Sequence, residues 1–182
     1  MKTLIKVSSM ILLGLFSCKK DPLNSLPEAT QMGANTMGCL VDGQAFELIS
    51  AGFNTTPLGV TRFQRRSRML FYFRQQSGKL NRTILLSIPY LRSPGRYVLD
   101  QVADPSFTLI APAYGNFQSS NPEPSRDYLT SPVATGHVLI TRFDSVAHII
   151  SGTFEFTAQK TSGEGPETVR LTDGRFDLRY PQ

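Results

Sequence analysis

Hydrophobic and polar positions alternate most regularly towards the end of the chain. In the run 150–158 every even-numbered residue is apolar or glycine, and every odd-numbered residue is polar. The run 175–180 repeats the pattern, with Phe176, Leu178 and Tyr180 on one face. A period of two is typical of a β-strand with one buried and one solvated face. We predict two strands here, with bulges or bends at Gly152 and Gly174.

Turn signals divide the rest of the chain into short β-strands. Asp42-Gly43 and Ser77-Gly78 each lie between apolar-bearing runs and predict hairpins. Residues 136–144 and 148–160 predict a third hairpin, whereas Asp173-Gly174 is a bulge or a tight turn. No segment after residue 18 has a convincing helical period. The expected fold is an antiparallel all-β sandwich of about eight to ten strands, with a closed meander β-barrel as the alternative.

The first residues have the pattern of an export signal. Lys2 and Lys6 precede an apolar run of about ten residues, against the roughly 20 that a membrane-spanning helix needs. The run ends in "LFSC", which resembles the lipobox of bacterial lipoproteins and implies lipid attachment at Cys18. Anchoring by more than one acyl chain is stable. The expected location is the outer membrane, on its periplasmic face or at the cell surface.

Three segments follow from these patterns. We predict a signal peptide over 1–17, the lipidated cysteine with a flexible tether over 18–38, and a single all-β domain over 39–182. The tether would reach at most about 65–70 Å when extended. Cys39, the other of the two cysteines, has no disulfide partner if Cys18 carries lipid. Its apolar neighbours predict a buried free thiol.

Catalytic patterns are missing from the sequence. It has no nucleophile elbow and no H-E-x-x-H motif, and its carboxylates are scattered. His137 and His148 fall at opposite ends of the third predicted hairpin, too far apart to share a metal ion. We therefore expect no catalytic residue, no metal site and no cofactor, and we do not expect an enzyme. The net charge of +5 falls to +3 when Lys2 and Lys6 leave with the signal peptide, and this surplus favours an acidic partner only weakly. The expected compartment excludes nucleic acid.

Two regions contain candidate contact residues. Arginines cluster near residue 65 and form either a solvated turn or charged edge strand, or a contact for phosphate and sulfate groups on glycans or lipopolysaccharide. The candidates there are Arg62, Arg65, Arg66 and Arg68. Residues 111–136, rich in Pro, Ser, Asn and Gly, predict a long contact loop. Its candidates are Tyr114, Phe117, Arg126 and Tyr128, whose rings could instead cover the core, with Tyr128 in an edge strand.

Several segments resemble a known family. "TMGCLVDGQAF", "VLITRFDSVAHIISGTFEFTA" and "LTDGRFDLRY" are similar to segments of an uncharacterised family of Bacteroidota lipoproteins. The resemblance implies a lipoprotein with an all-β fold and transfers no catalytic residue. Lys20-Asp21 resembles the export signals of surface lipoproteins in this group. Asp144-Ser145-Val146 resembles its O-glycosylation motif, which makes Ser145 a candidate for modification, with an ordinary turn as the alternative.

The expected function is therefore that of a membrane-anchored lipoprotein of the cell envelope. We expect a non-catalytic binding module for a surface glycan or protein. The alternative is a structural or accessory lipoprotein that contacts other envelope proteins. A concave groove lined by tyrosine would favour the binding module, and a flat apolar patch would favour the accessory role.

Overall fold

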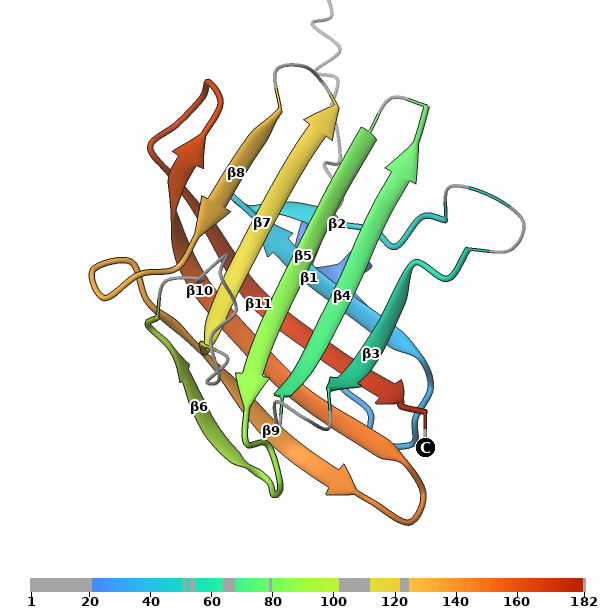
Figure 1. Cartoon of the computed structure of the whole chain (residues 1–182). Coiled ribbons are helices and arrows are strands. Elements are labelled where there is room, and N and C mark those ends of the chain that lie inside the picture. Colours follow the sequence, from blue (N-terminus) through green and yellow to red (C-terminus); the bar gives the residue numbers. More distant parts are fainter. Residues whose placement is uncertain are drawn as a thin grey trace, which may run out of the picture.

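Among the residues that the computed structural model describes, eleven strands form one antiparallel sheet (Figure 1). The structure describes residues 21–50, 52, 55–63, 68–78, 80–101, 112–121 and 125–181. A short 3-10 turn, η1 (Pro22–Ser25), precedes the strands. The strands are β1 (Thr36–Val41), β2 (Gln44–Phe46), β3 (Leu58–Phe63), β4 (Arg68–Ser77), β5 (Leu80–Pro89), β6 (Gly95–Leu99), β7 (Tyr114–Asn121), β8 (Arg126–Leu129), β9 (Gly136–Asp144), β10 (Ile149–Ser162) and β11 (Thr168–Arg179). The expected antiparallel all-β fold is confirmed.

The sheet folds over itself into two layers. Its strand order is β2-β1-β11-β10-β8-β7-β5-β4-β3, and β6 and β9 form a branch that pairs with β10. In Figure 1, β8, β7, β5, β4 and β3 run side by side in front, and β1, β10 and β11 cross behind them. The long strand β10 pairs with β11 on one side and with both β9 and β8 on the other. The end strands β2 and β3 do not pair with each other, so the sheet is not closed into a barrel.

Phenylalanine rings join the two layers across the core. Phe71 and Phe73 of β4 lie with their ring centroids 5.2 and 6.2 Å from that of Phe176 in β11. Phe154 of β10 stacks on Phe73 at 6.2 Å. Full burial of one such side chain stabilises the fold by about 1.5–3 kcal/mol. The two faces predicted as apolar from the alternation are therefore the faces that hold the sheet's layers together.

Cys39 lies within this core. Its side chain is fully buried and the thiol is free. Burial raises the pKa of the thiol far above its usual value, because the thiolate would lose its hydration. The expected buried free cysteine is confirmed.

The three predicted hairpins are present. Asp42 and Gly43 both have positive φ, 49° and 78°, in a two-residue turn that pairs Val41 with Gln44. Ser77 pairs with Leu80, and β9 returns as β10. The pairing register shifts beside Gly152 and again opposite Gly174, so both glycines lie at bulges. Strand β11 continues through Gly174, and the alternative of a tight turn there is wrong.

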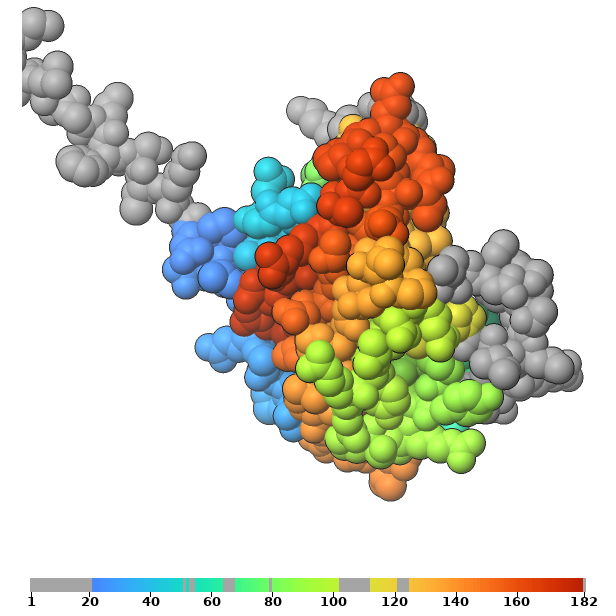
Figure 2. Space-filling model, turned by 90° about the vertical axis from the view of Figure 1, so that its left-hand side faces the viewer, coloured from blue at the N-terminus to red at the C-terminus, as the bar shows by residue number. Residues whose placement is uncertain are grey.

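The N-terminal segment packs on the sheet in a part of the chain that was predicted to be a flexible tether. Leu26 and Pro27 lie against Gly38 of β1. Four residues further along donate hydrogen bonds to the carboxylate of Asp177, namely Thr30, Met32, Gly33 and Ala34. Figure 2 shows this N-terminal segment, in blue, against the red strand β11. The flexible tether predicted for 18–38 is therefore too long, because its second half belongs to the folded domain. Cys18 lies outside the described residues, and no helix among those described is long and apolar enough to cross a bilayer.

Candidate functional site

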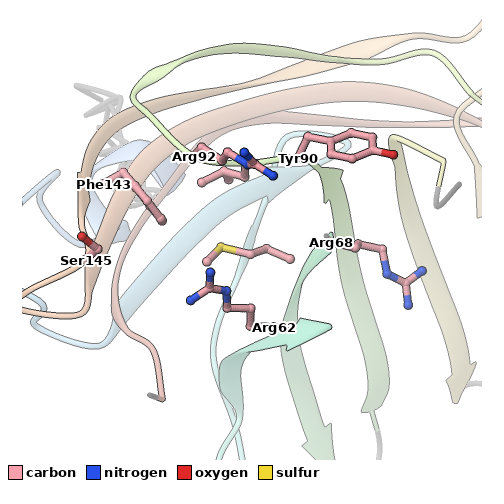
Figure 3. Close-up of a pocket in the computed structure, with 8 residues that line it drawn as sticks. Arg62, Arg68, Tyr90, Arg92, Phe143 and Ser145 are labelled. Carbon is pink, nitrogen blue, oxygen red and sulfur yellow. The ribbon is translucent and has the colours of Figure 1, made fainter. Parts of the chain in front are cut away.

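A cavity of about 510 Å³ opens at the end of the sheet where β3 and β5 end and β9 turns into β10. This volume lies within the range of small-molecule sites. The antiparallel register places the end of β3, the start of β4 and the end of β5 side by side. Residues that are distant in sequence therefore meet there. The lining residues are Arg62, Arg68, Met69, Tyr90, Leu91, Arg92, Phe143 and Ser145 (Figure 3).

The apolar side of the cavity is continuous with the protein core. Met69 and Leu91 are both buried core residues. Phe143 is half-buried and stacks on Tyr180, with ring centroids 5.9 Å apart and the planes within 3° of parallel. These side chains form an apolar surface that is held in place by packing.

Two exposed arginines supply the positive charge of the cavity. Arg62 lies near the end of β3, and Arg92 lies three residues beyond the end of β5. Neither forms an ion pair or a hydrogen bond with any residue that the structure describes. Figure 3 shows them on two sides of the cavity. No carboxylate belongs to the described lining, so nothing there neutralises these two charges.

Arg68 differs from these two arginines. Its side chain is only 4% exposed, and its guanidinium carbon lies 4.6 Å from the centroid of the Phe63 ring. In Figure 3 its guanidinium group points away from Arg62 and Arg92. The structure thus brings the predicted candidates Arg62 and Arg68 to one cavity, with only Arg62 presenting its charge there. Arg65 and Arg66 lie outside the described residues.

Tyr90 holds an unusual backbone conformation at the rim. Its φ is +53°, and its side chain is 55% exposed. The left-handed conformation costs a bulky L-residue about 1–2 kcal/mol. The ring forms no hydrogen bond within the described part of the chain, so burial and polar contacts there do not explain its position. Sequence reasoning missed Tyr90 and Arg92, although "PYLR" at the end of a strand marks a turn with an aromatic and a basic side chain.

Ser145 lies at the tip of the β9–β10 turn. Asp144 shapes this turn by accepting hydrogen bonds from the backbone N–H groups of Val146 (3.0 Å) and Ala147 (2.8 Å). The Ala147 N–H and the Arg142 side chain, at 2.8 Å, lower the pKa of Asp144 to about 2. Ser145 itself is exposed, as the predicted hairpin tip requires. Its glycosylation stays a prediction.

The prediction of a contact loop over 111–136 is wrong for most of its candidate residues, because they are buried in strands. The segment contains β7 and β8, which pair with each other, and β8 also pairs with β10 and so is not an edge strand. Phe117 and Tyr128 are buried in the core, with ring centroids 6.1 Å apart. Tyr114 is also buried. The alternative, in which the rings belong to the core, describes these residues.

Arg126 borders a second hollow of about 170 Å³ at the other end of the sheet. Phe117 and Tyr128 contribute to its lining, together with Arg82. Arg82 is the third residue of β5 and Tyr90 directly follows the last, so the two hollows lie about 26 Å apart along that strand. The two regions singled out in the sequence therefore do not form one site.

The histidines lie where the sequence predicted. His137 is near the start of β9, with its Nδ1 atom 3.6 Å from a carboxylate oxygen of Glu155, and His148 directly precedes β10. The register separates them by about 20 Å. No group of three or more His, Cys, Asp and Glu side chains close enough to hold a metal ion occurs within the described ranges.

One comparison with known proteins gives a match. A family model described as a domain of unknown function (DUF6252) matches residues 75–177, which is more than half of the chain. This match extends from the end of β4 into β11 and includes Tyr90, Arg92 and Ser145. No curated protein and no solved structure matches the chain significantly.

Proposed function

We propose a function for this chain, which belongs to the DUF6252 family, from its arginine-lined cavity. The protein is a non-catalytic binding module of the cell envelope, and its ligand is a surface glycan or protein that carries an anionic group. A lipid on Cys18 anchors it to the outer membrane, on the periplasmic face or at the cell surface. The family is an uncharacterised one, as the resemblance implied, and Bacteroidota lipoproteins are the group to which we assign it.

The observation that carries this proposal is the pair Arg62 and Arg92 at one cavity. Neither has an ion-pair partner among the described residues, and like charges that share a hollow repel each other. An anionic ligand would remove this repulsion. Guanidinium groups suit phosphate, sulfate and carboxylate groups because their planar N–H donors match two oxygens at once.

The shape of the cavity favours a binding module over an accessory protein. A concave site with an exposed tyrosine was the feature expected of a binding module, and Tyr90 lies at such a site. The accessory role would need a flat apolar patch. Val98 and Leu139 are 50% and 41% exposed on the outer face of β6 and β9, but their strand partners are His137 and Arg96. This apolar area is small and interrupted by polar side chains, which supports the accessory role only weakly.

The attachment of the N-terminal segment supports a module held near the membrane. Leu26 lies against β1, so only the eight residue steps from Cys18 to Leu26 can span the distance from the lipid to the domain. These steps reach at most about 28 Å. A module on so short a tether would meet ligands that lie at the membrane surface.

The test uses two polymers that differ only in charge. Full-length protein in detergent is passed over immobilised dextran sulfate and over neutral dextran. We expect retention on dextran sulfate only, weakening with salt because screening reduces the attraction. The double substitution Arg62→Ala and Arg92→Ala should weaken binding at least tenfold.

The control variant is Arg170→Ala, which removes an exposed arginine of β11 that does not line the cavity. It should bind nearly as well as the unaltered protein. Equal retention on both polymers, or equal losses for Arg170→Ala and for each cavity arginine substituted singly, would contradict the proposal. In the second case binding would follow from net charge alone.

A further inference from the structure

We infer that the ligand of the arginine-lined cavity is a saccharide with an anionic substituent, whose sugar ring stacks on Tyr90 while its anion lies between Arg62 and Arg92. This inference rests on the proposed function and adds the chemical class of the ligand. It also assigns Tyr90 as the residue that distinguishes such a saccharide from a simple anion.

The first argument is the backbone at Tyr90. Its φ of +53° is a conformation that glycine adopts without strain and asparagine with little. A chain that needed only the turn after β5 would be more stable with either of those residues. Strained residues of this kind concentrate at functional sites, where the strain holds a side chain in a useful position.

The second argument is the exposure of the ring. Tyr90 is 55% exposed, and its hydroxyl has no hydrogen-bond partner among the described residues. The tyrosines of the core, such as Tyr128 and Tyr180, are 3% and 4% exposed. Tyr90 therefore offers its ring to a ligand, and tyrosine suits such contacts because it buries a large area with few rotatable bonds.

The third argument is the mixture of surfaces that line the cavity. Met69, Leu91 and Phe143 give an apolar floor, and the two arginines and the Ser145 hydroxyl give polar groups at the rim. A pyranose ring has an apolar C–H face and a polar edge of hydroxyl groups. The face fits an aromatic ring or an apolar floor, and the edge fits guanidinium and hydroxyl donors. A bare phosphate or sulfate ion would use the arginines and leave Tyr90 without a role.

The experiment separates the ring from the anion. Isothermal titration calorimetry of the full-length protein in detergent compares glucose 6-phosphate, inorganic phosphate and glucose. We expect glucose 6-phosphate to bind at least tenfold more tightly than either of the other two. Tyr90→Asn should bind inorganic phosphate as before and lose this tenfold preference, whereas Tyr90→Phe should keep it.

Thermal unfolding of the same variants tests the role of the strain. Asparagine tolerates positive φ, so Tyr90→Asn should melt at an unchanged temperature or about 2–4 °C higher. A fall of many degrees would show that the ring supports the fold, and the inference would be wrong. It would also be wrong if glucose 6-phosphate bound no more tightly than phosphate, or if Tyr90→Asn kept the preference.

Two further outcomes distinguish a saccharide ligand from a nucleotide ligand and from a simple anion. Adenosine monophosphate that bound more tightly than glucose 6-phosphate would indicate an aromatic base on Tyr90 and would overturn the saccharide. Retention on dextran sulfate that depends on Arg62 and Arg92, together with a failure of the Tyr90 tests, would uphold the proposed function and reject the inference.

Discussion

Asp177 is the residue whose environment departs most from its sequence pattern. The alternation over 175–180 placed it on the solvated face, yet its side chain is only 1% exposed. The N-terminal segment covers it and supplies four donors: the Thr30 hydroxyl at 2.7 Å and the N–H groups of Met32, Gly33 and Ala34 at 2.8–3.0 Å. The Ser151 hydroxyl gives a fifth hydrogen bond at 2.7 Å. Burial raises the pKa of this carboxyl, but the hydrogen bonds outweigh it and hold the pKa well below its usual value.

At this scale we predict that Asp177→Asn lowers the free energy of unfolding by about 3 kcal/mol at pH 7. The amide keeps one acceptor oxygen but directs N–H groups at backbone donors. Urea unfolding measures the loss. The matched control is Ser151→Ala, which removes one hydrogen bond of the five and should cost about 1 kcal/mol.

The same substitution has a pH signature. Because the folded pKa of Asp177 is depressed, its stabilising contribution is present above the ordinary aspartate pKa of about 4 and is lost as the pH falls below it. Between pH 5 and pH 2 the unaltered protein should therefore lose more stability than Asp177→Asn. Asp144, whose pKa is also lowered, contributes equally to both proteins. Parallel pH curves would show that Asp177 does not carry this dependence.

At the scale of the element, β7 and β8 show how pairing overrides composition. "YGNFQSSN" has no β-branched residue, and its Gly, Asn and Ser residues are typical of a loop rather than of a strand. The segment is nevertheless a strand because β5 and β8 lie on either side of it. Ile84, Phe117 and Tyr128 are neighbours across the three strands, and each faces the core.

We therefore predict that Phe117→Ala lowers the free energy of unfolding by about 3–5 kcal/mol, because it leaves a cavity between the layers. The next residue provides the control. Gln118 is exposed, so Gln118→Ala should change stability by less than about 0.5 kcal/mol. Chemical denaturation compares the two. An unchanged denaturation midpoint for Phe117→Ala would contradict this prediction and support a role for Phe117 in contacts with a partner.

At the scale of the whole molecule, the proposed lipid anchor and the folded domain are separable. We predict that Cys18→Ala moves the protein from the membrane fraction to the soluble fraction and abolishes incorporation of labelled palmitate. The control is Cys39→Ala, because Cys39 is buried in the core and offers no thiol for acylation. That variant should keep both the label and the membrane location. Cys18→Ala protein that stayed in the membrane fraction would contradict the anchor.

The local features of this protein are predictable from its sequence. The alternation over 150–158 predicted which face of β10 is buried, and Asp42-Gly43 predicted the turn between β1 and β2. Both features depend on neighbours within a few residues. The same holds for the bulges at Gly152 and Gly174 and for the exposed tip at Ser145.

Contacts between distant segments depend on the tertiary structure. Asp177 is buried because residues more than 140 positions earlier cover it. The alternation of polar and apolar residues within β11 cannot predict that contact. Arg62 and Arg92 share a cavity because β4 and β5 run out and back between them, which returns the chain to the same end of the sheet. A strand pattern states which face is apolar, but not which segment will cover the other face. That choice depends on how the whole sheet folds over itself.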